Sequence, residues 1–101
     1  MKKVLTIAAV AALALPLTAN AERSGEELYN SKCSVCHAAG VAGAPKFGNA
    51  EEWAPRAEKG MDALLATAKS GLNAMPPMGT CMDCSDDELK ASIQYMLDAA
   101  Q

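Results

Sequence analysis

The sequence feature that most constrains this chain is the run Cys33-Ser34-Val35-Cys36-His37. Two cysteines separated by two residues and followed by histidine form the attachment signature of c-type haem. The spacing lets two thiols add to the two vinyl groups on one porphyrin edge, and the next residue offers an imidazole to the iron. A bare C-x-x-C motif also occurs in thiol-redox pairs and zinc sites. We predict one covalently bound haem c, attached to Cys33 and Cys36, with His37 as an axial iron ligand.

Residues 1–21 have the pattern of a secretory signal peptide. Lys2-Lys3 precedes an almost wholly apolar stretch, residues 4–15, and Ala19-Asn20-Ala21 is an A-x-A cleavage site. A retained membrane anchor is the alternative, but the apolar run is short for a span, which needs about 20 residues. We therefore expect cleavage of residues 1–21, a periplasmic domain of residues 22–101, and no integral membrane segment after cleavage.

The size and charge of the chain limit what it can bind. A domain this small buries only about 60% of its unfolded surface and is marginal without an added core element, which a haem would supply. The full chain has 12 acidic and 9 basic residues, a net charge of −3. Lys2 and Lys3 would leave with the signal peptide and make the mature domain more acidic. An acidic domain is a poor partner for nucleic acid and suits a basic patch on another protein.

Helix start signals and apolar periodicity predict an all-α domain. Three segments resemble capping boxes, with Ser or Asn followed three residues later by Glu: Ser24–Glu27, Asn49–Glu52 and Ser85–Glu88. The predicted helices span about residues 25–33, 50–59, 61–70 and 86–99, and residues 38–48 and 72–84 are predicted loops. No strand pattern occurs. We expect about four helices wrapped around one haem.

The sixth iron ligand has to come from a residue other than histidine, because the chain contains one histidine. Met61 and Met96 lie on apolar helix faces, where methionine usually fills gaps in the core. Met75 and Met78 flank Pro76-Pro77 in a loop whose backbone the prolines stiffen. Met75 is the first choice and Met78 the alternative. A further interpretation is that this segment is a proline-rich surface turn in which neither methionine binds the iron.

Trp53 and Arg56 share one predicted helix and are candidates for the haem environment. Both carry N–H donors that suit a haem propionate. Alternatively, Trp53 packs against the macrocycle and Arg56 is solvated. The sequence does not choose between these roles.

These motifs, together with residues 71–79 and Cys81-Met82-Asp83-Cys84, resemble the class I c-type cytochromes, and specifically the bacterial cytochrome c5 family. The resemblance implies the small cytochrome c fold, with His37 and Met75 as ligands of a low-spin iron. It also implies a Cys81–Cys84 disulfide. The competing interpretation is a four-thiolate zinc site made of Cys33, Cys36, Cys81 and Cys84. In such sites the two C-x-x-C pairs are usually separated by about 15–20 residues, and here the gap between the pairs is much longer.

Two further expectations come from the same resemblance. Gly25 and Tyr29 stand where the family crosses its first and last helices, and Tyr95 is the expected partner of Tyr29. The carbonyl of Pro45 stands where the family accepts a hydrogen bond from the proximal imidazole, which would orient the ring of His37.

The function implied by the resemblance is periplasmic transport of single electrons, without enzymatic activity. Suitable partners are respiratory redox proteins such as a quinol-oxidising complex, a terminal oxidase or a reductase, and they would dock near the small uncharged side chains of residues 38–45. A haem peroxidase would need a vacant iron position and a distal acid-base group, and no second histidine supplies one. A sensor that binds a gas after methionine release is the third function class.

Overall fold

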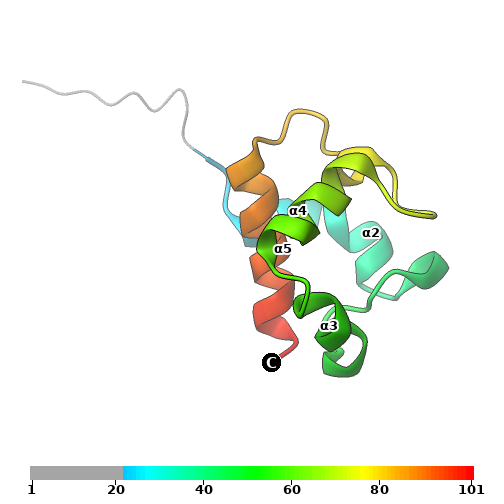
Figure 1. The fold of residues 1–101 in the computed structure, drawn as a ribbon. Coiled ribbons are helices and arrows are strands. Elements are labelled where there is room, and N and C mark those ends of the chain that lie inside the picture. Colours follow the sequence, from blue (N-terminus) through cyan, green and yellow to red (C-terminus); the bar gives the residue numbers. More distant parts are fainter. Residues whose placement is uncertain (1–21) are drawn as a thin grey trace, which may run out of the picture.

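The computed structural model describes residues 22–101, and the predicted signal peptide, residues 1–21, lies outside them. The α-helices of this part are α1 (Gly25–Leu28), α2 (Ser34–His37), α3 (Ala50–Ala57), α4 (Met61–Ser70) and α5 (Asp86–Ala99) (Figure 1). Two short 3-10 turns, Val41–Gly43 and Pro77–Thr80, lie within the predicted loops. A π-helical segment, Tyr29–Cys33, joins α1 to α2 in one continuous helical run. Residues 22–101 contain no strand beyond one isolated bridge between Leu72 and Met75. The predicted all-α fold of about four helical segments is therefore confirmed.

The capping motifs position the helix starts, but only one is a complete capping box. The Ser85 hydroxyl accepts from the amide of Glu88, and the Glu88 carboxylate accepts from the amide of Ser85. At α3 the Asn49 side chain accepts from the amide of Glu52, as expected. The Glu52 carboxylate instead accepts from the amide of Lys46 at 2.7 Å, so the predicted second box is only half formed. Helix α3 also ends at Ala57, two residues before the predicted Lys59.

Helices α1 and α5 cross at very short range, as the resemblance implies. A Cβ atom at Gly25 would lie 2.1 Å from the carbonyl oxygen of Ala91 in α5. The Tyr29 and Tyr95 rings meet beside this crossing with centroids 5.5 Å apart. Figure 1 shows the chain's first helical segment against α5, although residues of the two are far apart in sequence.

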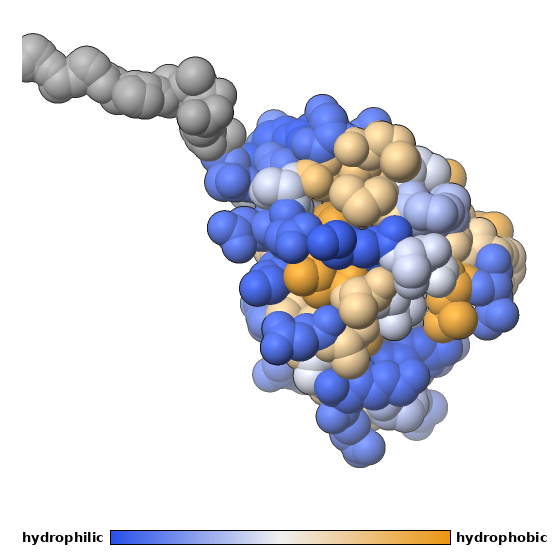
Figure 2. Space-filling view, turned by 45° about the horizontal axis from the view of Figure 1, so that its top comes forward, coloured by the Kyte–Doolittle hydropathy of each residue, from blue (hydrophilic) through white to orange (hydrophobic). Residues whose placement is uncertain are grey.

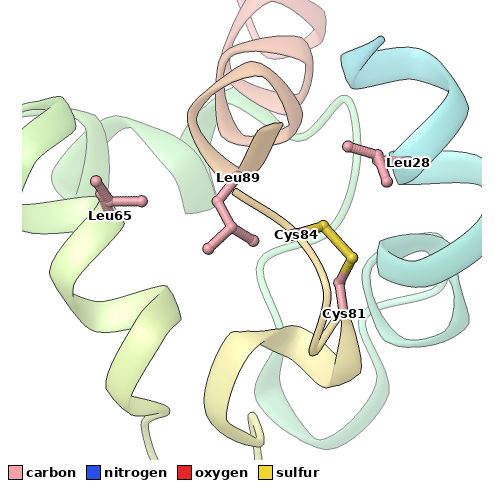
Figure 3. Close-up of a cluster of buried hydrophobic side chains, with 5 residues drawn as sticks. All are labelled: Leu28, Leu65, Cys81, Cys84 and Leu89. Atoms are coloured by element: carbon pink, nitrogen blue, oxygen red, sulfur yellow. A yellow bond between two sulfur atoms is a disulfide. The ribbon is translucent and has the colours of Figure 1, made fainter. Parts of the chain in front are cut away.

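Buried side chains in residues 22–101 form two clusters. The first, which we call the disulfide cluster, packs one residue each of α1, α4 and α5 around the disulfide and contains Leu28, Leu65, Cys81, Cys84 and Leu89 (Figure 3). The second, the aromatic cluster, contains Tyr29, Trp53, Met96 and Ala100, with Cys33, Phe47, Tyr95 and Leu97 packed against it. Helix α5 buries Leu89, Ile93 and Met96, which recur at helical spacing on one face. Met61, a predicted core residue, is only half-buried and lies outside both clusters.

An ion pair fastens the start of the described chain to α5. The Arg23 side chain donates to both oxygens of Glu88, with Nε 2.8 Å from Oε2 and Nη2 3.0 Å from Oε1, and the Arg23 amide donates to Oε2 at 2.9 Å. The hydrogen bonds from the Arg23 side chain, its amide and the amide of Ser85 lower the pKa of Glu88 from 4.5 to about 2. In this part of the chain, no helix is long and apolar enough to span a bilayer.

Candidate haem-binding site

The two cysteines and the histidine of the motif lie on one helical run. Cys33 ends the π-helical segment, and Cys36 and His37 belong to α2. Both cysteines are free and half-buried. Burial raises the pKa of the Cys33 thiol. Cys81 and Cys84 form a disulfide with each other. The four cysteines therefore do not make a thiolate site in this structure.

His37 is buried and its ring is held by one hydrogen bond. Its Nδ1 lies 2.9 Å from the carbonyl oxygen of Pro45. A carbonyl can only accept, so Nδ1 carries the hydrogen and donates it, and the lone pair of Nε2 is left available to a metal. The amide of Phe47 donates to the His37 carbonyl at 2.7 Å, which ties the loop after the motif back to α2. The loop thereby fixes both the orientation and the tautomer of the imidazole.

Trp53 stacks near the histidine with an unpaired donor. Its ring centroid lies 5.9 Å from that of His37 at an interplanar angle of 27°. The side chain is 5% exposed, and its Nε1–H has no hydrogen-bond partner among the described residues. Buried donors are nearly always paired, and an unpaired one costs about 1–3 kcal/mol. An acceptor on a bound group would satisfy this buried indole N–H. Arg56, one turn further on, is half-buried and donates to the backbone carbonyl of Glu52.

The loop that carries Met75 is closed on itself by backbone hydrogen bonds. The amide of Leu72 donates to the Met75 carbonyl at 3.0 Å, and the amide of Met75 donates to the Leu72 carbonyl at 2.9 Å. Asn73, at the turn between them, has a φ of 53°, a left-handed conformation that asparagine tolerates well. Pro76 and Pro77 then fix the backbone beyond Met75. Both sides of Met75 are thus restrained.

Met78 occupies a different environment from Met75. It packs against the disulfide cluster, whereas Met75 belongs to neither cluster. Met78, Gly79 and Thr80 have consecutive positive φ values of 62°, 56° and 69°. This left-handed turn directs the chain from the methionine loop into the disulfide. The sequence indicated only an extended loop here, because a run of left-handed residues that includes Met and Thr has no local signature.

Sequence reasoning also missed Phe47 and Leu72. Phe47 packs on Tyr29 with ring centroids 4.6 Å apart and donates its amide to His37. A single aromatic residue within a Gly- and Ala-rich loop is a signal that points to such packing. Leu72 holds Met75 through backbone atoms alone, for which the sequence carries no signal.

The side chains collected here fit a haem c. They supply two free thiols on one helical run, one imidazole nitrogen with an available lone pair, a thioether in a restrained loop and a buried donor without an acceptor. Each matches a group that a covalently bound haem presents: vinyl carbons, two axial positions on the iron, and a propionate.

The surface near the motif contains exposed apolar side chains. Val35, between the two cysteines, is 74% exposed, and Val41 in the following loop is 50% exposed. Leu72 and Met82 are the other large apolar residues that the described part of the chain exposes. Figure 2 shows apolar residues reaching the surface among hydrophilic ones on one face of the molecule.

Comparison with known proteins gives one consistent group of relatives. The family model described as "Cytochrome C oxidase, cbb3-type, subunit III" matches residues 20–96. Cytochrome c5 of Ectopseudomonas mendocina is 54% identical over 76 residues, which cover 73% of this chain and 87% of that protein. Cytochrome c5 of Azotobacter vinelandii is also 54% identical over 76 residues, covering 73% of this chain and 92% of that protein.

Solved structures with the same fold agree with these relatives. A chain in the crystal structure of an electron transfer complex of nitrite reductase with cytochrome c has a TM-score of 0.74 and 52% identity, covering 76% of this chain and 94% of its own. A mono-heme ferrocytochrome c from Shewanella putrefaciens has a TM-score of 0.68 and 53% identity, covering 73% of this chain and 91% of its own.

Proposed function

The chain belongs to the class I c-type cytochromes and resembles cytochrome c5, and from this premise we propose that it is a periplasmic electron carrier whose iron is ligated by His37 and Met75. As a member of this family, the chain is a monohaem cytochrome c that carries electrons and is not an enzyme. Its cofactor is one covalently bound haem c. The ligands, the attachment residues, the location and the partners are the proposal.

The attachment residues are Cys33 and Cys36. The support for them is that both thiols are free, half-buried and on the same helical run as His37. On attachment, each thiol would add across one vinyl group, so that its sulfur bonds to one vinyl carbon and its hydrogen goes to the other. The link then ties the cofactor to the backbone from which the axial imidazole projects.

The observation that carries the proposal is the hydrogen bond between His37 Nδ1 and the Pro45 carbonyl at 2.9 Å. A histidine that donates from one ring nitrogen to a backbone carbonyl presents the other as a lone pair of raised basicity. Because the ring is buried and lies beside Trp53, it has little freedom to turn away. These are the properties of a permanent axial ligand.

Met75 is the favoured second ligand for two reasons. Its backbone amide and carbonyl are both bonded to Leu72, so its position is restrained before any metal bond forms. Met78 packs against the disulfide cluster, whereas Met75 belongs to neither cluster and is free of such a packing role. A thioether ligand stabilises ferrous iron and raises the reduction potential.

The electron-transfer chemistry is the haem's own, a one-electron change of the iron between ferric and ferrous states. The chain contributes two ligands held by rigid backbone, so little structure has to change with each electron. Trp53 contributes a buried N–H donor to a propionate, and its unpaired Nε1 supports this role. Arg56 is a weaker contributor, because one of its donors is used by the Glu52 carbonyl.

The proposed partners are respiratory redox enzymes. The related chain solved in an electron transfer complex with nitrite reductase favours a reductase as an electron acceptor of this chain too. The exposed Val35 and Val41 lie in or next to the haem motif and support docking at that edge. The acidic charge of residues 22–101, more negative than the −3 of the full chain once Lys2 and Lys3 have left, would steer the encounter with a basic patch on the partner. The periplasmic location follows from the pattern of residues 1–21.

The ligand assignment is tested by comparing Met75→Ala with Met78→Ala in the ferric holoprotein. The measurement is the far-red sulfur-to-iron absorption band, which requires a bound thioether. Met75→Ala is expected to lose the band while keeping its covalent haem, and Met78→Ala is expected to keep the band. The reverse pattern would make Met78 the ligand, and loss of the band in neither variant would refute methionine ligation from this loop.

A further inference from the structure

Gly71 lies directly against the backbone of the methionine loop. A Cβ atom built on it would be 2.8 Å from the carbonyl oxygen of Met75, 3.0 Å from the nitrogen of Pro77 and 3.2 Å from the carbonyl carbon of Pro76. All three atoms belong to the main chain, so no side-chain rotation can relieve the contact. The end of α4 and the Met75–Pro77 segment therefore approach one another as closely as a glycine permits.

The same helix provides an internal comparison at its other end. Gly60 precedes α4 with φ 89° and ψ 158°, and Gly71 follows it with φ 86° and ψ 159°. A Cβ atom at Gly60 would meet nothing within 4 Å. Alanine at either site has the same backbone cost, because both glycines share one conformation that other residues rarely adopt. The two sites differ in what the added methyl group touches.

The loop has no route by which to move away from such a methyl group without moving Met75. The contact at Gly71 falls on the Met75 carbonyl oxygen, the same atom that accepts from the Leu72 amide at 3.0 Å. On the far side, Pro76 and Pro77 restrict the backbone torsions. A displacement that starts at this carbonyl passes to the Met75 Cα and from there to its thioether.

We propose that Gly71 is a positioning residue for the Met75 ligand: its lack of a side chain lets the end of α4 serve as the surface on which the Met75-Pro76-Pro77 backbone rests. The inference builds on the proposed ligation by Met75. Adding a methyl group at Gly71 shifts the equilibrium from methionine-bound to methionine-free iron, whereas the same change at Gly60 affects only the fold.

The experiment measures how well imidazole competes with the thioether in the ferric holoprotein. Imidazole binds only when methionine has left, so its apparent affinity reports the methionine-free fraction. Gly71→Ala is expected to bind imidazole on the order of tenfold more tightly than the parent chain, the size expected for an overpacked contact. Gly60→Ala is expected to change this affinity by no more than about twofold, with a similar cost in overall stability.

A double variant separates ligand positioning from general damage. In a Met75→Ala background there is no thioether to displace, so adding Gly71→Ala should leave the imidazole affinity unchanged. If Gly71→Ala still raises the affinity there, or if Gly60→Ala raises it equally in the parent chain, Gly71 has no specific role. A Gly71→Ala protein that is unfolded at a temperature where Gly60→Ala is folded by far-UV circular dichroism would also overturn the proposal. Survival of the far-red band in Met75→Ala alone would instead refute the ligand assignment.

Discussion

Replacing Gly25 with alanine is expected to destabilise the domain, although alanine is the better helix former. Gly25 is the first residue of α1, and its ideal Cβ atom would be 2.1 Å from the carbonyl oxygen of Ala91, 2.6 Å from its carbonyl carbon and 3.2 Å from the amide nitrogen of Ser92. These are backbone atoms in α5, so α1 as a whole has to move away from α5. Two effects of opposite sign therefore compete at this one position.

The magnitudes decide the outcome. Helix propensity alone would favour alanine over glycine by about 0.5–1 kcal/mol. To reach ordinary van der Waals separation the two helices must part by roughly 1 Å or more, and overpacking of this kind costs typically about 1–3 kcal/mol. The movement also loosens the Tyr29–Tyr95 contact next to the crossing. We expect a net loss of about 1–2 kcal/mol, equivalent to roughly 4–8 °C in Tm for each kcal/mol in a domain of this size.

The assay is guanidinium and thermal unfolding of the ferric holoprotein, followed by far-UV circular dichroism. The midpoint should fall with the denaturant slope unchanged, because the same surface is exposed on unfolding. Glu26→Ala, at the exposed neighbouring position in α1, is the matched control and is expected to stay within about 0.5 kcal/mol of the parent chain. A Gly25→Ala protein as stable as the parent, or more stable, would show that the close crossing with α5 does not exist in solution.

Further predictions concern pH, the disulfide, the propionate donor and docking. Because the folded-state pKa of Glu88 is lowered from 4.5 to about 2, its stabilising contribution is present above pH 4.5 and is lost as pH falls toward 2; Glu88→Gln should flatten the unfolding free energy over this window, and an unchanged slope in acid titrations would contradict the ion pair. The double variant Cys81→Ala, Cys84→Ala should lose roughly 2 kcal/mol at most from the unfolded-chain entropy while keeping the haem spectrum and reduction potential, and loss of electron transfer in the folded variant would indicate a redox role for these cysteines. Trp53→Phe removes the donor to a charged propionate, so the pH dependence of the reduction potential should move to higher pH; an unmoved profile would leave Trp53 with packing alone. Val41→Lys and Val41→Glu should both slow electron transfer to a reductase in stopped-flow experiments, and rates equal to the parent at all ionic strengths would place docking elsewhere.

Local signals in the sequence were sufficient for the helices and the motif. The Ser85 capping box and the apolar face of the last helix lie within a few residues of one another, and the structure contains both. Helix α4 has the predicted bounds, Met61–Ser70. The predicted capping box at Asn49 forms only in part, because the Glu52 carboxylate accepts from the amide of Lys46 and not from that of Asn49. The π-helical turn at Tyr29–Cys33 also escaped prediction, since its residues have no distinctive helical period.

The sequence alone determined the cofactor, because covalent attachment requires thiols and an imidazole at fixed spacing within five consecutive residues. It also predicted that the second ligand is one of two methionines beside the prolines. In the structure these two methionines have different surroundings: Met78 packs on the disulfide cluster, and the backbone of Met75 is hydrogen-bonded to that of Leu72. Tertiary structure alone set Gly25 of α1 against Ala91 of α5. A contact of that kind depends on how whole helices pack, and a glycine that touches a distant backbone has the same local sequence appearance as one that touches nothing.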